Sequence, residues 1–147
     1  MQAFGQNAGE KKRFFNIKPR IVHENQKMFT QKYANKDFLQ QIKEIFRCDR
    51  LRYTTPHIFS IQRVAVCGGA GASFFKQALA GQADIYISGD FKYHDFFLTE
   101  NRIMIADIGH YESEQFTKEI FYEILTKKIS KFAVQFSEIN TNPIKYL

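Results

Sequence analysis

The chain of 147 residues has a hydrophobic fraction of 44% and an aromatic fraction of 16%, enough for one domain with a sizeable core. This composition excludes an intrinsically disordered chain. No apolar run approaches the roughly 20 residues of a membrane-spanning helix, and the N-terminus lacks the apolar region of a signal peptide, so we expect no membrane association.

The net charge of +6 is concentrated at the N-terminus. Residues 1–34 hold seven Lys or Arg and two Glu, a net charge of +5, whereas residues 35–147 hold fourteen Lys or Arg and thirteen Asp or Glu. Such a basic segment can contact nucleic acid or an anionic surface. No RNA-binding aromatic motif or zinc-finger spacing accompanies it, so a solvated basic arm is the simpler interpretation.

Two cysteines, Cys48 and Cys67, form neither a disulfide framework nor a metal-binding spacing. We expect both to be thiols in the core of a cytoplasmic protein, because the reducing cytoplasm is where unpaired cysteines are ordinarily found.

Residues 1–34 show no clean hydrophobic period, and we expect an irregular segment with at most a short strand near residues 20–23. From Asn35 the pattern changes. The stretch NKDFLQQIKEIF has apolar residues at helical spacing and a candidate N-cap in Asn35, which predicts a helix. LRYTT follows as a short strand candidate. We therefore divide the chain into residues 1–34 and an α/β domain of residues 35–147.

Further along, short apolar runs alternate with helical stretches. Three buried strands are expected, each with a glycine within two residues of its end: RVAVC (63–67), DIYIS (84–88) and RIMIAD (102–107). Helices are expected at ASFFKQALA, which Gly81 ends, at KYHDFFLTEN, and as one long helix at ESEQFTKEIFYEILTKK. The alternation in KFAVQFSE predicts an edge or half-buried strand. The whole pattern predicts an α/β fold with βαβ units and a mostly parallel sheet.

Ligands of parallel sheets bind beyond the carboxyl ends of the strands. The three clearest strands end in CGGAGAS, SGDFKYH and DIGHYESE, and each of these ends combines glycine with polar or small residues. The three loops are expected to gather at one sheet edge and form a site. The first of them lacks the spacing of a phosphate-binding loop, so a tight strand-to-helix turn is the simpler interpretation.

Two of these loops carry histidine four residues from a carboxylate. In GDFKYHD, Asp90 and His94 would share one helical face, where a carboxylate can orient an imidazole. Asp90 can equally act as a helix cap, and the spacing does not decide between the two roles.

In DIGHYESE, His110 and Glu114 would converge if a helix begins at or before the histidine. Imidazole nitrogen with carboxylate oxygen suits Zn, Mn, Fe or a similar cation. Two ligands do not complete a site, however. The spacing alone favours the simpler interpretation, in which Glu112 and Glu114 complement the helix dipole and His110 lies in a turn.

Four stretches taken in order, VAVCGGAGASF, YISGDFKYHDF, ADIGHYESE and NTNPIKYL, resemble the C-terminal part of the Nif-three-like proteins. These are also named GTP cyclohydrolase I type 2 homologues, or dinuclear metal-centre proteins. The resemblance covers residues 35–147, whereas residues 1–34 match poorly. It implies an α/β fold of two related halves, a toroidal homohexamer, and two divalent metals held between the halves.

On the matching positions, the resemblance implies that His110 and Glu114 are metal ligands and that Asp90 and His94 lie beside them in the second shell. The family's early half carries two adjacent histidines followed by proline, and a later aspartate. This chain has four histidines, none of them adjacent: His23, His57, His94 and His110. We therefore expect the early half to be missing, as in a C-terminal fragment, a split-gene product or a naturally shortened member.

The family likeness favours a metal-dependent hydrolase, similar to GTP cyclohydrolase, with an incomplete two-metal site that takes up Zn, Mn or Fe weakly. The alternative is a ring-forming binding or assembly module that contacts nucleic acid or protein without catalysis. A third interpretation is a product without activity of its own, complemented by a separately encoded N-terminal half. Loss of the early half would uncover apolar helices and favour homo-oligomers. The phenylalanines concerned are Phe74, Phe75, Phe96, Phe97, Phe116 and Phe121.

Overall fold

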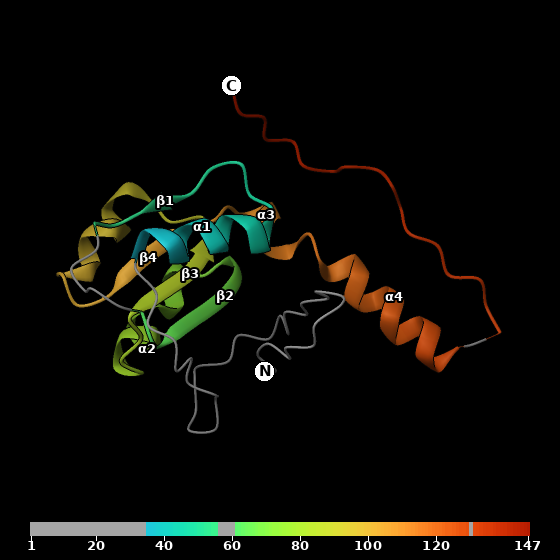
Figure 1. Ribbon diagram of the computed structural model, residues 1–147, viewed down its shortest axis with the longest axis horizontal. Coiled ribbons are helices and arrows are strands. Elements are labelled where there is room, and N and C mark those ends of the chain that lie inside the picture. Colours follow the sequence, from blue (N-terminus) through green and yellow to red (C-terminus); the bar gives the residue numbers. More distant parts are fainter. Residues whose placement is uncertain (1–34, 56–60, 130) are drawn as a thin grey trace.

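A four-stranded sheet forms the centre of the molecule, with strand order β1-β4-β3-β2 (Figure 1). The computed structural model describes residues 35–55, 61–129 and 131–147. The strands are β1 (Arg52–Tyr53), β2 (Val64–Ala70), β3 (Ile85–Gly89) and β4 (Met104–Asp107). β2, β3 and β4 run parallel, and β1 pairs antiparallel with β4. The predicted α/β class and mostly parallel sheet are thus confirmed.

The two central strands are buried along their whole length, which is why they read as continuous apolar runs rather than as alternating ones. Their register pairs Ile85 with Met104 and Ser88 with Asp107. This register sets the two carboxyl ends at the same level of the sheet, so the loops after β3 and β4 start side by side.

Helices cover both faces of the sheet. α1 (Asn35–Phe46) packs Leu39, Ile42 and Phe46 into one apolar cluster with Ile85 and Ile87 of β3. The predicted helix at these residues is confirmed.

The short helices η1 (Ala72–Phe74) and α2 (Phe75–Ala80) lie on the other side. There Phe75 and Ala78 join a second apolar cluster with Tyr86. Successive residues of β3 thus point to opposite clusters, as strand geometry requires. Gly81 is the C-cap of α2, as predicted, and the left-handed residue is the next one, Gln82, at φ 55°.

Three predicted elements differ from the structure. β2 continues through its glycines to Ala70, with an irregular register between Val66 and Ala70. The stretch predicted as a second helix is the 3-10 helix η2 (Tyr93–Thr99). The predicted long helix is divided into α3 (His110–Glu114) and α4 (Thr117–Lys128). Phe116, at the break, is buried in the core, and this anchor fixes where the chain changes direction.

The predicted strand within KFAVQFSE is wrong. Within residues 131–147 the structure has no helix or strand, and this segment runs beside α4 and back towards the sheet (Figure 1). A strand needs a neighbour for its backbone hydrogen bonds, and α4 offers side chains only. Phe136 instead stacks on Tyr122 of α4, with ring centroids 4.3 Å apart.

α4 projects from the body of the molecule and buries none of its residues (Figure 1). Of the six phenylalanines expected to lose cover, Phe75 and Phe116 are buried and Phe96 is partly buried. Phe74, Phe97 and Phe121 are exposed, with 38%, 64% and 60% of their surfaces accessible. The expectation of uncovered apolar surface thus applies to part of the set.

Both cysteines are free thiols buried in the core, as predicted. Burial raises the pKa of Cys48. Among the described residues no helix combines the length and apolar character needed to cross a membrane.

Candidate metal centre

The carboxyl ends of β2, β3 and β4 meet at one edge of the sheet, as the sequence predicts. Ser88, at the end of β3, donates its hydroxyl to the carbonyl of Gly69 at 3.1 Å. The amide of Gly69 in turn donates to the hydroxyl of Ser113 on α3 at 2.7 Å. A Cβ added to Gly89 would lie 2.8 Å from the carbonyl of Gly109, so glycine permits this close approach. The three loops therefore form one packed unit.

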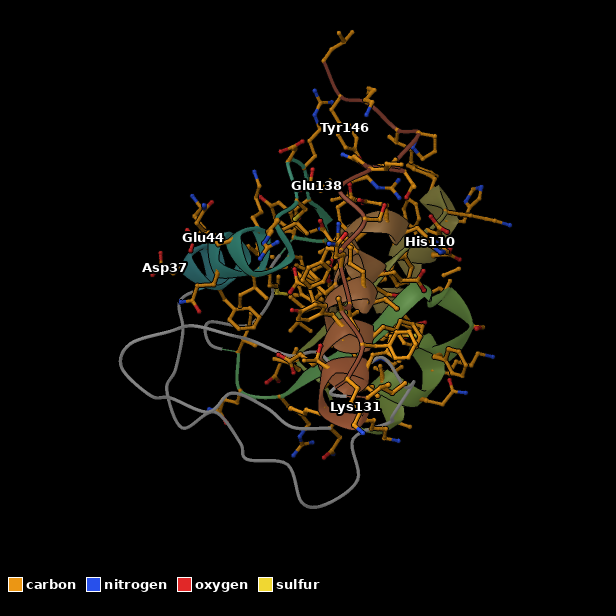
Figure 2. All side chains as sticks on the ribbon, turned by 90° about the vertical axis from the view of Figure 1, so that its right-hand side faces the viewer. Asp37, Glu44, His110, Lys131, Glu138 and Tyr146 are labelled. Atoms are coloured by element: carbon orange, nitrogen blue, oxygen red, sulfur yellow. The ribbon has the colours of Figure 1, made fainter. Side chains whose placement is uncertain are left out.

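His110 and Glu114 converge on one face of α3. The helix begins at His110, directly after Gly109, whose φ of 90° suits glycine. His110 Nε2 lies 3.3 Å from Glu114 Oε2, and the two side chains are 49% and 45% exposed. Both groups are thus open to a ligand from solvent. Figure 2 shows His110 on the side of the molecule away from Asp37 and Glu44 of α1.

The floor under this pair is the backbone of Gly69, at the irregular end of β2. Gly69 has φ 65°, a conformation that side chains disfavour. A Cβ at this position would lie 2.7 Å from Glu114 Oε1 and 3.4 Å from His110 Nε2. The absence of a side chain at Gly69 therefore leaves the room that the two functional groups occupy.

Asp90 holds the other nitrogen of the histidine. Its Oδ2 lies 2.6 Å from His110 Nδ1. An ionised carboxylate only accepts hydrogen bonds, so Nδ1 carries the proton and donates it. In the neutral ring, Nε2 then keeps its lone pair on the side of Glu114. Asp90 is thereby a carboxylate that fixes the tautomer and the orientation of a candidate ligand.

The expectation that Asp90 and His94 share a helical face is wrong. Asp90 precedes η2 in a left-handed conformation, with φ 59°. Capping at the start of η2 falls to Asp95, whose carboxylate accepts the amide of Lys92 at 2.7 Å. The exposed His94 contacts the ring of Tyr93 at 5.4 Å between centroids. Asp90 joins the His110 group and His94 does not.

The charges around His110 favour its protonated form. The hydrogen bond to Asp90 raises the pKa of His110, and the charges of Asp90 and Glu114 act in the same direction, while desolvation opposes them. Any cation that bound Nε2 at mildly acidic pH would have to displace a proton from this ring.

The residues present fit half of a metal centre. Two ligands at about 2.0–2.2 Å from a tetrahedral ion lie roughly 3.3 Å from each other, which is the separation of His110 Nε2 and Glu114 Oε2. Among the described residues, however, no group of three or more His, Cys, Asp or Glu is placed to hold a metal ion. Further ligands must come from elsewhere if an ion is held tightly.

The sequence pattern does not single out three residues that shape this region: Gly69, Ser113 and the buried Glu112. Glu112 lies in the first turn of α3, where the helix dipole favours a carboxylate, and it is buried, with 7% of its surface accessible. Its Oε1 accepts a hydrogen bond from Asn142 Nδ2 at 3.3 Å. Helical spacing places Glu112 on a different face of the helix from His110 and Glu114. This spacing is the feature of the sequence that indicates a separate environment for Glu112.

One family model matches most of the chain. The sequence model described as Duf34/NIF3 (NGG1p interacting factor 3) matches residues 20–143. The match begins before residue 35, in a part that the structure does not describe.

A protein of Staphylococcus epidermidis named GTP cyclohydrolase 1 type 2 homolog is 37% identical over 115 residues, which are 75% of this chain and 31% of that protein. A Streptococcus pneumoniae protein of the same name is 34% identical over 119 residues, covering 76% of this chain and 45% of that one. The chain thus spans less than half the length of these relatives.

Solved structures show the same fold. Staphylococcus aureus protein SA1388 aligns with a TM-score of 0.69 at 26% identity, over 82% of this chain and 40% of its own. A Bacillus cereus protein related to NIF3 aligns with a TM-score of 0.67 at 22% identity, over 82% of this chain and 34% of its own. With the profile match over most of its length, this chain belongs to the Duf34/NIF3 family.

Proposed function

We propose that His110 and Glu114 form one half of a divalent-metal centre, and that the chain serves a metal-dependent hydrolase related to GTP cyclohydrolase. The observation that carries this proposal is the convergence of His110 Nε2 and Glu114 Oε2 at 3.3 Å above a glycine. A neighbouring carboxylate that binds the far side of the histidine supports it, because such pairs are typical of metal-ligating histidines.

The chemistry follows from the donor set. Imidazole with carboxylate suits Zn, Mn or Fe, and such an ion, when bound, makes water a nucleophile near neutral pH. Glu114 and His110 would hold the ion, and Asp90 keeps the imidazole turned so that Nε2 faces the ligand. Their exposure of about half leaves room for a substrate.

The centre requires groups beyond those described. Relatives named GTP cyclohydrolase 1 type 2 homolog are more than twice as long as the matched region. We propose that the remaining ligands come from a separately encoded N-terminal half or from another copy in a homo-oligomer. Alone, the chain should take up metal weakly and below one ion per chain.

Metal analysis tests this proposal. The chain is purified, incubated with Zn²⁺ or Mn²⁺, and measured by isothermal titration calorimetry and plasma mass spectrometry. We expect weak uptake that His110→Ala and Glu114→Gln abolish, whereas the control Glu123→Gln on exposed α4 changes nothing. Uptake that persists in both site variants would remove the metal proposal, and two tightly held ions per chain would remove the claim of an incomplete site.

A second candidate, an assembly module, is favoured by the surface of α4. Phe121, Ile124 and Leu125 are 60%, 43% and 38% exposed on this projecting helix. Contiguous apolar surface of this kind marks protein interfaces. Light scattering of the purified chain should show an oligomer, which Ile124→Lys weakens. A clean monomer at micromolar concentration would exclude self-assembly.

Nucleic acid is the other partner considered for such a module. The basic cluster concerned lies outside the described residues and consists of Lys11, Lys12, Arg13, Lys18 and Arg20. If this cluster contacts phosphates, affinity for a single-stranded oligonucleotide should fall steeply with salt. Absent or salt-independent binding would leave protein as the partner.

A further inference from the structure

The C-terminal motif NTNPIKYL has no role in the centre described above, yet it contacts the helix that carries both candidate ligands. Asn142 Nδ2 donates to Glu112 Oε1 on α3 at 3.3 Å. The other end of the same amide, Asn142 Oδ1, accepts the amide of Ile144 at 3.0 Å. Asn140 Oδ1 in turn accepts the amide of Asn142 at 2.9 Å. These local bonds fix the turn that presents Asn142 to α3.

Glu112 is a favourable point from which to hold α3. It lies midway between His110 and Glu114 in sequence, and it is buried. Its Oε2 is packed so closely that a Cβ on Gly109 would lie 2.2 Å from it. A buried carboxylate without donors is costly, so the hydrogen bond from Asn142 is worth more here than at the surface.

The segment that carries Asn142 is attached to the body at a second point. Arg50 lies over the ring of Tyr146, with its guanidinium carbon 5.1 Å from the ring centroid. Its guanidinium also donates to the carbonyl of Leu147. Figure 2 shows Tyr146 and Glu138 of the returning segment at one end of the molecule. The returning chain is thus held at Asn142 and again at its last two residues.

α3 depends on contacts of this kind because it has only five residues. A helix of this length is unstable by itself. The body of the domain holds this helix through several hydrogen bonds. The amide of Gly69 donates to the hydroxyl of Ser113, Gln115 Nε2 at the C-cap donates to the carbonyl of Phe46 at 2.7 Å, and Asp90 bonds His110 Nδ1. The contact of Glu112 with Asn142 adds a hydrogen bond from the C-terminal segment.

We propose that residues 140–147 are a clasp for α3, and that Asn142 is a positioning residue which sets His110 and Glu114 through Glu112. The consequence for metal uptake rests on the proposed function, whereas the consequence for α3 does not. The clasp explains what this motif does for a site whose ligands lie about thirty positions earlier in the chain.

Exchanging the donor and the acceptor tests the clasp in the full chain. Asn142→Asp keeps the acceptor for Ile144 but turns a carboxylate towards Glu112. Glu112→Gln/Asn142→Asp restores a bond with its direction reversed, because the new amide can donate to the new carboxylate. Thr141→Ala, an exposed neighbour, is the matched control.

Two measurements on the metal-free chain give the answer. Amide hydrogen exchange of Ser113 and Gln115 should speed up roughly tenfold or more in Asn142→Asp, the factor expected for a hydrogen bond to a buried charge. The imidazole ¹⁵N signals of His110 should shift in the same variant. In the double variant, the exchange rates should return to within about twofold of the parent rates. The His110 signals should return to their parent positions.

The results for Asn142→Asp and for the double variant decide whether the clasp exists and whether Asn142 acts through Glu112. Unchanged exchange and unchanged His110 signals in Asn142→Asp would overturn the clasp. Changes that the double variant fails to reverse would overturn the pairing of Asn142 with Glu112. Zn²⁺ titration of these variants and of His110→Ala separates the two proposals: if His110→Ala binds Zn²⁺ like the parent, the metal proposal fails while the exchange result still decides the clasp.

Discussion

Two regions of this chain differ in what holds them in place. At the sheet edge, the ends of β2, β3 and β4 and the short helix α3 are joined by hydrogen bonds among buried groups such as Ser88, Gly69 and Ser113. On α4, no residue is buried, and the segment that follows it is mostly exposed.

The difference shows which structure the chain builds with its own contacts. The sheet edge is complete in the sense that its polar groups have partners from several elements. α4 forms by local hydrogen bonding but presents its apolar side chains to solvent, so a second surface must cover it if the helix is to contribute to stability as buried helices do.

The largest predicted effect contrasts the two regions with one type of substitution. Ile105→Ala removes a side chain that is fully buried in the central strand β4 and should lower the free energy of unfolding by about 2–5 kcal/mol. Ile124→Ala, on exposed α4, should change it by less than about 0.5 kcal/mol.

Urea unfolding followed by circular dichroism measures both variants at a protein concentration where the chain has one association state. Equal losses for the two variants would contradict the contrast between the regions. A large loss for Ile124→Ala that appears only at high protein concentration would locate the cover of α4 in a second copy.

The next effect concerns the floor of the site. Gly69→Ala forces a side chain into a left-handed conformation, which costs about 1–2 kcal/mol, and pushes Glu114 Oε1 from a position 2.7 Å away. We expect lower stability and weaker Zn²⁺ uptake together. Gly81→Ala is the matched control, since Gly81 has φ −74° and an added Cβ would meet its nearest atom at 3.3 Å.

Differential scanning calorimetry with and without Zn²⁺ gives both quantities. If Gly69→Ala and Gly81→Ala behave alike, then the close approach of β2 to α3 does not matter for the site. The difference in stability between the sheet edge and α4 would then come from the apolar core alone.

The sequence predicted the parts of this site that depend on local order. Strand ends followed by glycine, together with the rule for parallel sheets, predicted that three loops meet. The spacing of four residues allowed His110 and Glu114 to converge if a helix began at or before His110, although the spacing alone favoured the simpler interpretation. The helix does begin at His110, and the two side chains do converge. The family likeness, confirmed by the profile match, added the idea of a metal.

What escaped prediction depends on register and on distant partners. The family resemblance placed Asp90 beside the site, but the residues alone did not predict its hydrogen bond to His110. That bond depends on the register that sets Ser88 of β3 opposite Asp107 of β4, which no hydrophobic period encodes. The local spacing left Asp90 undecided between a helix cap and a partner of His94. The strand predicted around Phe132 and Phe136 failed for the same reason, since alternation shows two faces but not whether a neighbouring strand exists.

A smaller effect separates the charge of Asp90 from its hydrogen bond. Asn and Gly both tolerate the φ of 59° at this position. In Asp90→Asn the amide oxygen can still accept from His110 Nδ1, whereas Asp90→Gly has no acceptor. We expect the pKa of His110 to fall in both variants, and the preference for the proton on Nδ1 to survive only in Asp90→Asn.

The sign of the pH effect follows from the raised pKa. Because the folded-state pKa of His110 lies above its unfolded value of about 6.5, its contribution to stability is fully present below that pH. The contribution is lost as pH rises through the folded pKa. Imidazole ¹⁵N and ¹H titration by nuclear magnetic resonance measures the pKa and the tautomer. An unchanged pKa in Asp90→Gly would show that this carboxylate does not govern the ring.

The smallest effect tests how the returning segment lies on α4. Phe136→Ala removes the ring that stacks on Tyr122, whereas Phe132→Ala removes a ring that is 75% exposed. Neither should change the free energy of unfolding by more than about 0.5 kcal/mol, because both sites are at the surface. Backbone ¹⁵N relaxation should nevertheless show faster motion of residues 131–139 in Phe136→Ala alone. Equal mobility in both variants would mean that the stacking of Phe136 on Tyr122 does not hold the segment on α4.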